Sequence, residues 1–324
     1  MNKLLVICGP TATGKTELGI KLAQTFGGEI VSADSRQVYR GMTIGTGKEV
    51  GEGKWEVSRE ARCGKWVVNG VPVWLMDVVE PDYRFNVGDY KKYADEVLEN
   101  IWKRGKLPIV VGGTGFYIKA LLDGIGTIGV EPDWKLRRIL STKNIKILGA
   151  ELAKIDAERW EKMNESDRNN PRRLIRAIEI AKKIQNPKSK IQNYNSKLKI
   201  DNLLIVGLKA PYRVLYERID KRVEERVKQG IIEEIQKLIE KGYNWENSVL
   251  GSTLGYREWK DYFAGKLTKE EVICRWKFDE HNYARRQMTW FKKDPRINWF
   301  DITQEGWQTE VENLVKSWYS KANN

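Results

Sequence analysis

A glycine-rich segment near the start of the chain constrains the fold more than any other feature. It follows the pattern G-x-x-x-x-G-K-[ST], in which backbone N–H groups turn toward phosphate oxygens. The segment comprises Gly9, Pro10, Thr11, Ala12, Thr13, Gly14, Lys15 and Thr16. An apolar run precedes it at residues 4–8, and a helical pattern follows it at 17–26. This strand–loop–helix context predicts an α/β fold with a phosphate-binding loop.

Two side chains of this loop are suited to phosphate chemistry. The Lys15 ammonium can neutralise phosphate charge, and the Thr16 hydroxyl can ligate a Mg²⁺ ion that contacts phosphate oxygens. The positive end of the following helix dipole strengthens such binding. The loop by itself indicates neither which phosphate compound binds nor whether phosphate is transferred.

Short apolar runs alternate with helical patterns over the first 120 residues, which is typical of a mostly parallel sheet flanked by helices. We predict strands over 4–8, 29–32, 73–77 and 107–111, a hairpin partner over 65–68, and a helix over 87–104. Ligands of such sheets bind beyond the carboxyl ends of the strands. Residues 34–35 and 112–114 follow two of these strands, so we expect both segments to meet the phosphate-binding loop at one site.

The middle of the chain has a different character, because helical patterns replace the apolar runs. We predict helices over 134–141, 149–163 and 171–184, followed by an exposed connection over 185–199. Residues 203–208 have the composition of a strand, and we expect the chain to return to the sheet there. The prediction is a P-loop core of residues 1–123 and 201–324, with an all-helical insertion of residues 124–200.

The net charge of the chain indicates what kind of molecule it binds. The formal net charge is +13 over 324 residues. A small-molecule kinase does not need this excess, so the charge favours a polyanion such as a nucleic acid. A generally lysine-rich proteome is the alternative explanation.

A long helix is predicted over 212–240, with a break at Gly230. Arginines recur every four residues along it, at Arg218, Arg222 and Arg226. The simplest interpretation of this ridge is a solvated helix face. Its acidic partners would be Glu224, Glu225 and Asp220.

Residues that hold transition metals or act as bases are scarce. The chain has a single histidine, His281, and three scattered cysteines without a C-x-x-C pair. A general base is therefore expected to be a carboxylate, and Asp34 at a strand end could accept a proton or hold Mg²⁺ through water. A helix-capping role for Asp34 is the alternative. No apolar run approaches the length of a membrane span, and the first strand stands where a signal peptide would, so we expect a cytoplasmic protein.

Six segments occur in a specific order along the chain. They are GPTATGKT at 9–16, ADSRQVYRGMTIGTGK at 33–48, VVGGTGFY at 110–117, NPRRLIRAIE at 170–179, LGYRE at 254–258 and YARRQMTWF at 283–291. This succession resembles the tRNA dimethylallyltransferases, also called tRNA isopentenyltransferases, over about residues 3–301. The phosphate-binding loop is shared with many families, whereas the combination of the other segments is specific.

The resemblance implies transfer of a dimethylallyl group from its diphosphate to the exocyclic N6 amine of the adenosine just 3′ of a tRNA anticodon. The phosphate-binding loop would then hold diphosphate as a leaving group with Mg²⁺, and would not serve ATP hydrolysis. Asp34 would accept the proton of the amine and Thr114 would orient it. Arg222 would join the loop in stabilising the departing diphosphate.

The resemblance also implies contacts with tRNA. The implied residues are Asp34, Ser35, Arg36, Gln37, Thr114, Arg172, Arg173, Arg176, Ser252, Gly255, Tyr256 and Arg257. The helical insertion would bind the anticodon stem-loop, and one site per chain suggests a monomer. We expect Trp290 and Phe291 to brace the core. The alternatives are a P-loop small-molecule kinase or NTPase, which the first 120 residues alone would suggest, and an RNA-binding protein without catalysis.

Overall fold

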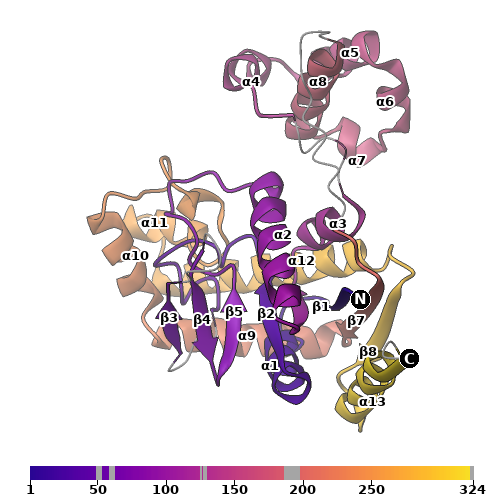
Figure 1. Ribbon diagram of the computed structural model, residues 1–324. Coiled ribbons are helices and arrows are strands. Elements are labelled where there is room, and N and C mark those ends of the chain that lie inside the picture. Colours follow the sequence, from indigo (N-terminus) through magenta and orange to yellow (C-terminus); the bar gives the residue numbers. More distant parts are fainter. Residues whose placement is uncertain (49–52, 58–62, 125, 127–129, 186–197, 322–324) are drawn as a thin grey trace. The chain divides into compact units, whose positions relative to one another are not determined.

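The computed structural model describes residues 1–48, 53–57, 63–124, 126, 130–185 and 198–321 (Figure 1). The chain divides into two compact units. A core unit comprises Met1–Asp123 and Leu198–Asn324, and a helical unit comprises Gly124–Lys197. Within the described ranges, no helix combines the length and apolar character that crossing a membrane requires.

An eight-stranded sheet forms the centre of the core unit, in the order β3-β4-β5-β2-β6-β1-β7-β8 (Figure 1). The strands are β1 (Lys3–Cys8), β2 (Gly28–Ser32), β3 (Lys54–Glu56), β4 (Lys65–Val68), β5 (Val71–Trp74), β6 (Leu107–Gly112), β7 (Asn202–Lys209) and β8 (Ile297–Asp301). All neighbours from β5 to β8 pair in parallel, whereas β4 is antiparallel to β3 and β5. The predicted class, a mostly parallel sheet with helices, is confirmed.

Helices cover both faces of this sheet. They are α2 (Val87–Lys103) and α3 (Gly115–Asp123) on one face, and α1 (Lys15–Phe26) and α13 (Trp307–Lys321) on the other. The core unit also contains α9 (Tyr212–Lys228), α10 (Ile231–Glu240), α11 (Lys260–Phe263) and α12 (Lys269–Phe291). Side chains of β1 alternate between two apolar clusters, as a strand requires. Leu4 and Val6 pack with α2 and α3, whereas Leu5 and Ile7 pack with α1 and α13. The strand is therefore buried on both faces.

A third apolar cluster lies beyond the sheet and positions α9 and α12. Ile219 and Val223 of α9 pack there with Trp276 and Ala284 of α12. Tyr39, from the segment after β2, is buried in the same cluster. This packing holds two long helices against the loop that follows β2.

The helical unit has a small core of its own. Its helices are α4 (Trp134–Ser141), α5 (Ile145–Ile155), α6 (Ala157–Lys162), α7 (Glu165–Arg168) and α8 (Pro171–Gln185). Leu140, Leu148 and Leu174 are buried together. The Glu179 carboxylate is almost fully buried and binds the guanidinium groups of Arg137 and Arg176.

Two predicted elements differ in the structure. The helix predicted over 149–163 is divided at Asp156, whose side chain accepts a hydrogen bond from the Arg159 N–H at 3.0 Å and caps α6. The strand predicted over 73–77 ends at Trp74, because Leu75 adopts a φ of 66° that a strand cannot continue. The predicted break at Gly230 is confirmed by its φ of 96°. The connection predicted over 185–199 lies mostly outside the described residues.

Candidate active site

The phosphate-binding loop connects β1 to α1, as predicted. Its shape is stabilised within the loop: the Thr13 hydroxyl donates to the Pro10 carbonyl at 2.9 Å, and the Lys15 ammonium reaches the same carbonyl at 2.7 Å. The Gln287 side chain also joins the loop to the turn that follows β6, the strand next to β1 in the sheet. The Gln287 side chain accepts a hydrogen bond from the Thr11 N–H at 2.8 Å and donates to the Gly113 carbonyl at 3.0 Å.

A pocket of about 120 Å³ opens between this loop, the ends of β2 and β6, and helices α9 and α12. It is lined by Thr11, Ala12, Gly14, Lys15, Thr16, Asp34, Gln37, Thr46, Gly47, Val111, Gly112, Gly113, Arg222, Arg226, Tyr283 and Gln287. The structure therefore brings the loop, Asp34, Gln37 and Arg222 together, although they are distant in sequence. We call this space the phosphate pocket.

Asp34 lines the phosphate pocket and also stabilises the turn that follows it. Its Oδ1 atom accepts hydrogen bonds from the backbone N–H groups of Arg36, at 2.7 Å, and Gln37, at 3.3 Å. Oδ2 accepts none from the residues that the structure describes. Residues 35–38 form a turn and not a helix, so the helix-capping interpretation of Asp34 is wrong. One carboxylate oxygen holds the turn, and the other remains available for the catalytic role.

Thr114 lies beside Asp34 at the start of α3. Its hydroxyl oxygen accepts a hydrogen bond from the Ser35 N–H at 3.1 Å, and its own N–H donates to the Ala33 carbonyl. Tyr283 of α12 also lines the phosphate pocket, together with Asp34. Burial raises the pKa of the Tyr283 hydroxyl, although a hydrogen bond with Thr114 acts in the opposite direction. The phenol is therefore a neutral group beside the Asp34 carboxylate.

The arginine ridge of α9 faces the phosphate-binding loop, so its interpretation as a solvated face is wrong. Arg222 donates to the Thr11 hydroxyl at 2.6 Å, and Arg218 donates to the Ala12 carbonyl at 3.4 Å. Arg226 is buried and donates to the Gly45 carbonyl at 3.3 Å. The proposed acidic partners bind other groups. These pairs are Glu224 with Lys277, Glu225 with Lys221, and Asp220 with His281.

The buried Glu280 carboxylate of α12 joins two of these arginines. It lies 3.3 Å from Arg226 and 3.6 Å from Arg222. The Nε atom of Arg222 is buried and has no hydrogen-bond partner among the described residues. The pocket thus contains a guanidinium group that is only partly neutralised.

Sequence reasoning missed Glu280, Tyr283 and Gln287 as site residues. They recur at a spacing of three and four along α12, and this spacing places them on one face of a helix. The signal was present in the chain, because these polar residues interrupt an otherwise apolar face. Phe291 is buried in the core as expected, whereas Trp290 is 40% exposed, so bracing the core does not account for it.

A second pocket, of about 260 Å³, shares Thr11, Asp34, Arg222 and Tyr283 with the first. Its outer wall contains four of the predicted RNA contacts, which are Ser35, Arg36, Ser252 and Arg257. Arg36 donates to the Ser252 carbonyl at 3.3 Å, and Arg257 binds the Asp279 carboxylate at 2.6 Å. We call this space the outer pocket.

The turn beside the outer pocket corrects one prediction. The Tyr256 side chain is fully buried, and its hydroxyl donates to Glu234 at 2.6 Å. It is therefore a core group and not an RNA-contacting side chain. Gly255 has a φ of 86°, and its N–H donates to the Glu258 carboxylate at 2.9 Å. Both residues shape the turn that carries Arg257.

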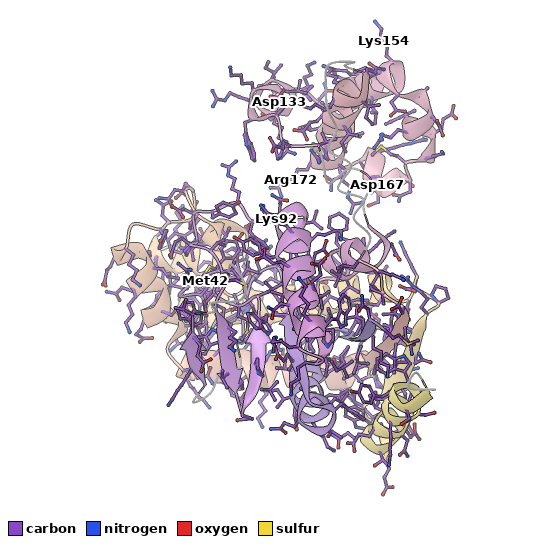
Figure 2. The ribbon with its side chains drawn as sticks, viewed as in Figure 1. Met42, Lys92, Asp133, Lys154, Asp167 and Arg172 are labelled. Carbon is purple, nitrogen blue, oxygen red and sulfur yellow. The ribbon has the colours of Figure 1, made fainter. Side chains whose placement is uncertain are left out.

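The remaining predicted RNA contacts lie on α8 of the helical unit. Arg173 is paired with Asp167, and Arg176 with Glu179 and the Val130 carbonyl. The Arg172 side chain is exposed and has no hydrogen bond or ion pair with any residue that the structure describes. Arg172 and Asp167 are labelled in Figure 2.

A phosphate-binding loop that faces a carboxylate and two arginines across one pocket defines a P-loop protein built for group transfer from a phosphorylated donor. The chain belongs to the IPP transferase family, whose model matches residues 37–294. A model described as isopentenyl transferase matches residues 2–71.

Similar proteins align with nearly the whole length of this chain. A tRNA dimethylallyltransferase of Roseiflexus sp. (strain RS-1) is 38% identical over 98% of this chain and 99% of its own length. The full-length tRNA isopentenylpyrophosphate transferase of Bacillus halodurans is 32% identical, covers 99% of this chain and 98% of its own, and has a TM-score of 0.68. A eukaryotic dimethylallyltransferase acting on tRNA has a TM-score of 0.77 at 27% identity, covering 100% of this chain and 80% of its own.

Proposed function

We propose that this protein transfers a dimethylallyl group from dimethylallyl diphosphate to the N6 amine of the adenosine 3′-adjacent to a tRNA anticodon. The C–O bond to diphosphate breaks, an N–C bond to adenine forms, and the amine loses one proton. The observation that supports this best is the arrangement of the phosphate pocket. Cationic groups for a leaving diphosphate and a carboxylate for the released proton line the same space.

The phosphate-binding loop and Arg222 act on the leaving group. Negative charge develops on the diphosphate as the C–O bond breaks, and preorganised N–H donors and cations stabilise it. Lys15 and Arg222 supply positive charge from two sides of the pocket.

A Mg²⁺ ion fits this arrangement. Mg²⁺ is usually bound through one or two protein oxygens together with substrate phosphates, so it needs no cluster of protein ligands. The described residues contain no group of three acidic, histidine or cysteine side chains that could hold a metal. Thr16 lines the pocket directly after Lys15 and would offer the hydroxyl ligand. The bound ion would neutralise diphosphate charge.

Asp34 and Thr114 act on the acceptor. An exocyclic amine of adenine is a poor nucleophile because its lone pair is delocalised into the ring. Asp34 Oδ2 would accept the proton as the N–C bond forms. Thr114 would orient the amine from the neighbouring turn, which its bond to Ser35 holds in place.

RNA would reach this site through the outer pocket. The target adenosine has to turn out of the anticodon loop to enter an enclosed site, as with other base-modifying enzymes. Arg36, Ser252 and Arg257 line that entrance, and Arg172 of the helical unit would contact the anticodon stem-loop. We further propose that the protein acts as a monomer, since one chain contains both halves of the site. We also propose that it acts in the cytoplasm.

Label transfer tests this function against a P-loop kinase or NTPase. The protein and Mg²⁺ are incubated with unmodified tRNA and dimethylallyl diphosphate labelled in the prenyl group, in parallel with γ-labelled ATP. Prenyl label in the tRNA, with ATP unchanged, is expected. Consumption of ATP without label in the tRNA would contradict the proposal and favour the kinase.

A further inference from the structure

An exposed aromatic pair lies outside the pockets described above. Phe116 of α3 is 43% exposed and Trp290 of α12 is 40% exposed. Their rings meet edge to face, with centroids 6.1 Å apart and an interplanar angle of 82°. Single exposed aromatic side chains are common on protein surfaces, whereas contiguous exposed apolar surface marks interaction sites and ligand-binding grooves.

The pair is held close to the reacting groups. A Cβ atom at Gly115 would overlap the Trp290 indole, so the absence of a side chain lets this ring pack on the backbone next to Thr114. Trp290 also lies one helical turn after Arg286, which lines the outer pocket. The aromatic surface therefore neighbours the place where the target adenosine would enter.

Trp290 forms one wall of a hollow of about 460 Å³, which we call the Trp290 pocket. This volume lies in the range of small-ligand sites, roughly 300–1,000 Å³. Ile118, Phe291 and Ile297 contribute apolar surface to the lining. The pocket is thus large enough, and apolar enough, to hold a flat ring against the indole.

The charged groups of the Trp290 pocket favour an anion. Its two carboxylates, Asp123 and Asp294, are both bound by Arg296, each at 2.7 Å. The ammonium groups of Lys119 and Lys293 also line the pocket. Neither makes a hydrogen bond or ion pair within the part of the chain that the structure describes.

We infer that the Trp290 pocket binds one unpaired nucleotide of the RNA, next to the adenosine that is modified. The base stacks on the Trp290 indole, and Lys119 and Lys293 face the phosphates on either side of it. Stacking on aromatic side chains beside cationic groups is a general mode of binding single-stranded nucleic acid. This inference rests on the proposed function, because it takes tRNA as the substrate.

A double-mutant cycle between protein and RNA tests the inference. The Kd of an anticodon stem-loop RNA is measured for the full chain and for Trp290→Ala. Each is also measured with RNAs that lack the base on one or the other side of the target adenosine. Trp290→Ala is expected to weaken binding of intact RNA about 10-fold, but to have no further effect on one of the RNAs without a neighbouring base.

Matched variants show whether Trp290→Ala weakens binding through lost stacking or through a disturbed fold. Phe278→Ala removes another exposed aromatic ring of α12, 63% exposed, and is expected to leave the Kd unchanged. Trp290→Phe keeps a stacking ring and is expected to restore most of the affinity. Losses by Trp290→Ala and by base removal that simply add, on both sides of the target, would overturn the inference.

Two further experiments identify which molecule binds in the Trp290 pocket. Lys119→Gln with Lys293→Gln is expected to reduce the salt dependence of RNA binding. Binding of adenosine monophosphate that is lost in Trp290→Ala but leaves the Kd of the RNA unchanged would assign the pocket to a free nucleotide and overturn the inference. Prenyl transfer by the wild type is measured first. If label reaches tRNA while the cycle is additive, the inference fails and the proposed function stands.

Discussion

The amide oxygen of Gln287 accepts a hydrogen bond from the Thr11 N–H, 2.8 Å away and 276 residues distant in sequence. Its amide nitrogen donates to the Gly113 carbonyl. One side chain of α12 therefore joins the phosphate-binding loop to the turn after β6. These two segments contribute the leaving-group side and the acceptor side of the site.

Replacing Gln287 by alanine should impair the reaction through geometry. Two hydrogen bonds of a buried amide are lost, and the loop and the turn are no longer held at a fixed separation. We expect kcat/KM for the prenyl diphosphate to fall about 10-fold, with RNA affinity little changed. Gln24→Ala is the control, because Gln24 also bonds a backbone carbonyl but lies on the surface of α1. Equal kinetics in both variants would exclude a positioning role for Gln287.

Asp34→Asn should separate stabilisation of the turn from catalysis. Asparagine also accepts hydrogen bonds from the Arg36 and Gln37 N–H groups, so the turn should persist. The amide cannot take up the proton of the amine, and we expect kcat to fall about 10²- to 10⁴-fold. RNA affinity should stay within a few-fold, measured by fluorescence anisotropy. A variant with near-normal single-turnover rate would remove Asp34 as the base.

Glu280→Ala should destabilise the fold, because it leaves the buried Arg226 guanidinium without its carboxylate. Removing one partner of a buried pair costs about 3–5 kcal/mol, which urea unfolding measures. Glu224→Ala breaks a different ion pair between α9 and α12, with Lys277, at an exposed position. Its unfolding midpoint should hardly change. Similar midpoints for the two variants would contradict the buried role of Glu280.

Glu258 should make stability depend on pH. Burial raises the pKa of this carboxyl to about 7, against 4.5 for an exposed glutamate. The folded protein therefore holds a proton that the unfolded chain releases between these values. The free energy of unfolding should fall as pH rises through this window, by up to about 3 kcal/mol. Glu258→Gln keeps an acceptor for the Gly255 N–H and should flatten this dependence; parallel wild-type and variant curves from pH 4.5 to 8 would be inconsistent with it.

The arginines of α8 should differ in their effects. Arg172→Gln removes an exposed cation and should weaken RNA binding while lowering the slope of log Kd against log salt by about 1. Arg176→Gln removes a partner of the buried Glu179 and should mainly destabilise the helical unit. The two variants are compared by salt titration of RNA binding and by thermal unfolding. An unchanged salt slope for Arg172→Gln would argue against its contact with phosphate.

Local patterns were sufficient to predict the phosphate-binding loop, the mostly parallel sheet and the position of Asp34 at a strand end. These features depend on neighbouring residues and on the edge at which parallel strands end. The orientation of α9 could not be predicted in the same way. Its apolar stripe and its arginine ridge have the same spacing of four residues, so periodicity does not indicate what the ridge faces.

The features that could not be predicted from the sequence depend on contacts between distant segments. Tyr256 lies in a motif that suggested RNA contact, but its hydroxyl reaches Glu234, which no local pattern indicates. Glu280 and Gln287 act through partners on other elements, and their roles emerge only when α9, α12 and the loop are packed together. The short edge strand β3 and the last strand β8 likewise depend on their neighbours in the sheet.

The position of β1 in the interior of the sheet, between β6 and β7, has a consequence for synthesis. Its two neighbours, β6 and β7, both come later in the chain, and β7 follows the whole helical unit. The phosphate-binding loop therefore leaves the ribosome long before the strand that closes one side of it. The helical unit, whose residues are consecutive and have their own core, can fold in the meantime. A nascent chain can thus complete the unit that would contact the anticodon stem-loop before it acquires a catalytic centre.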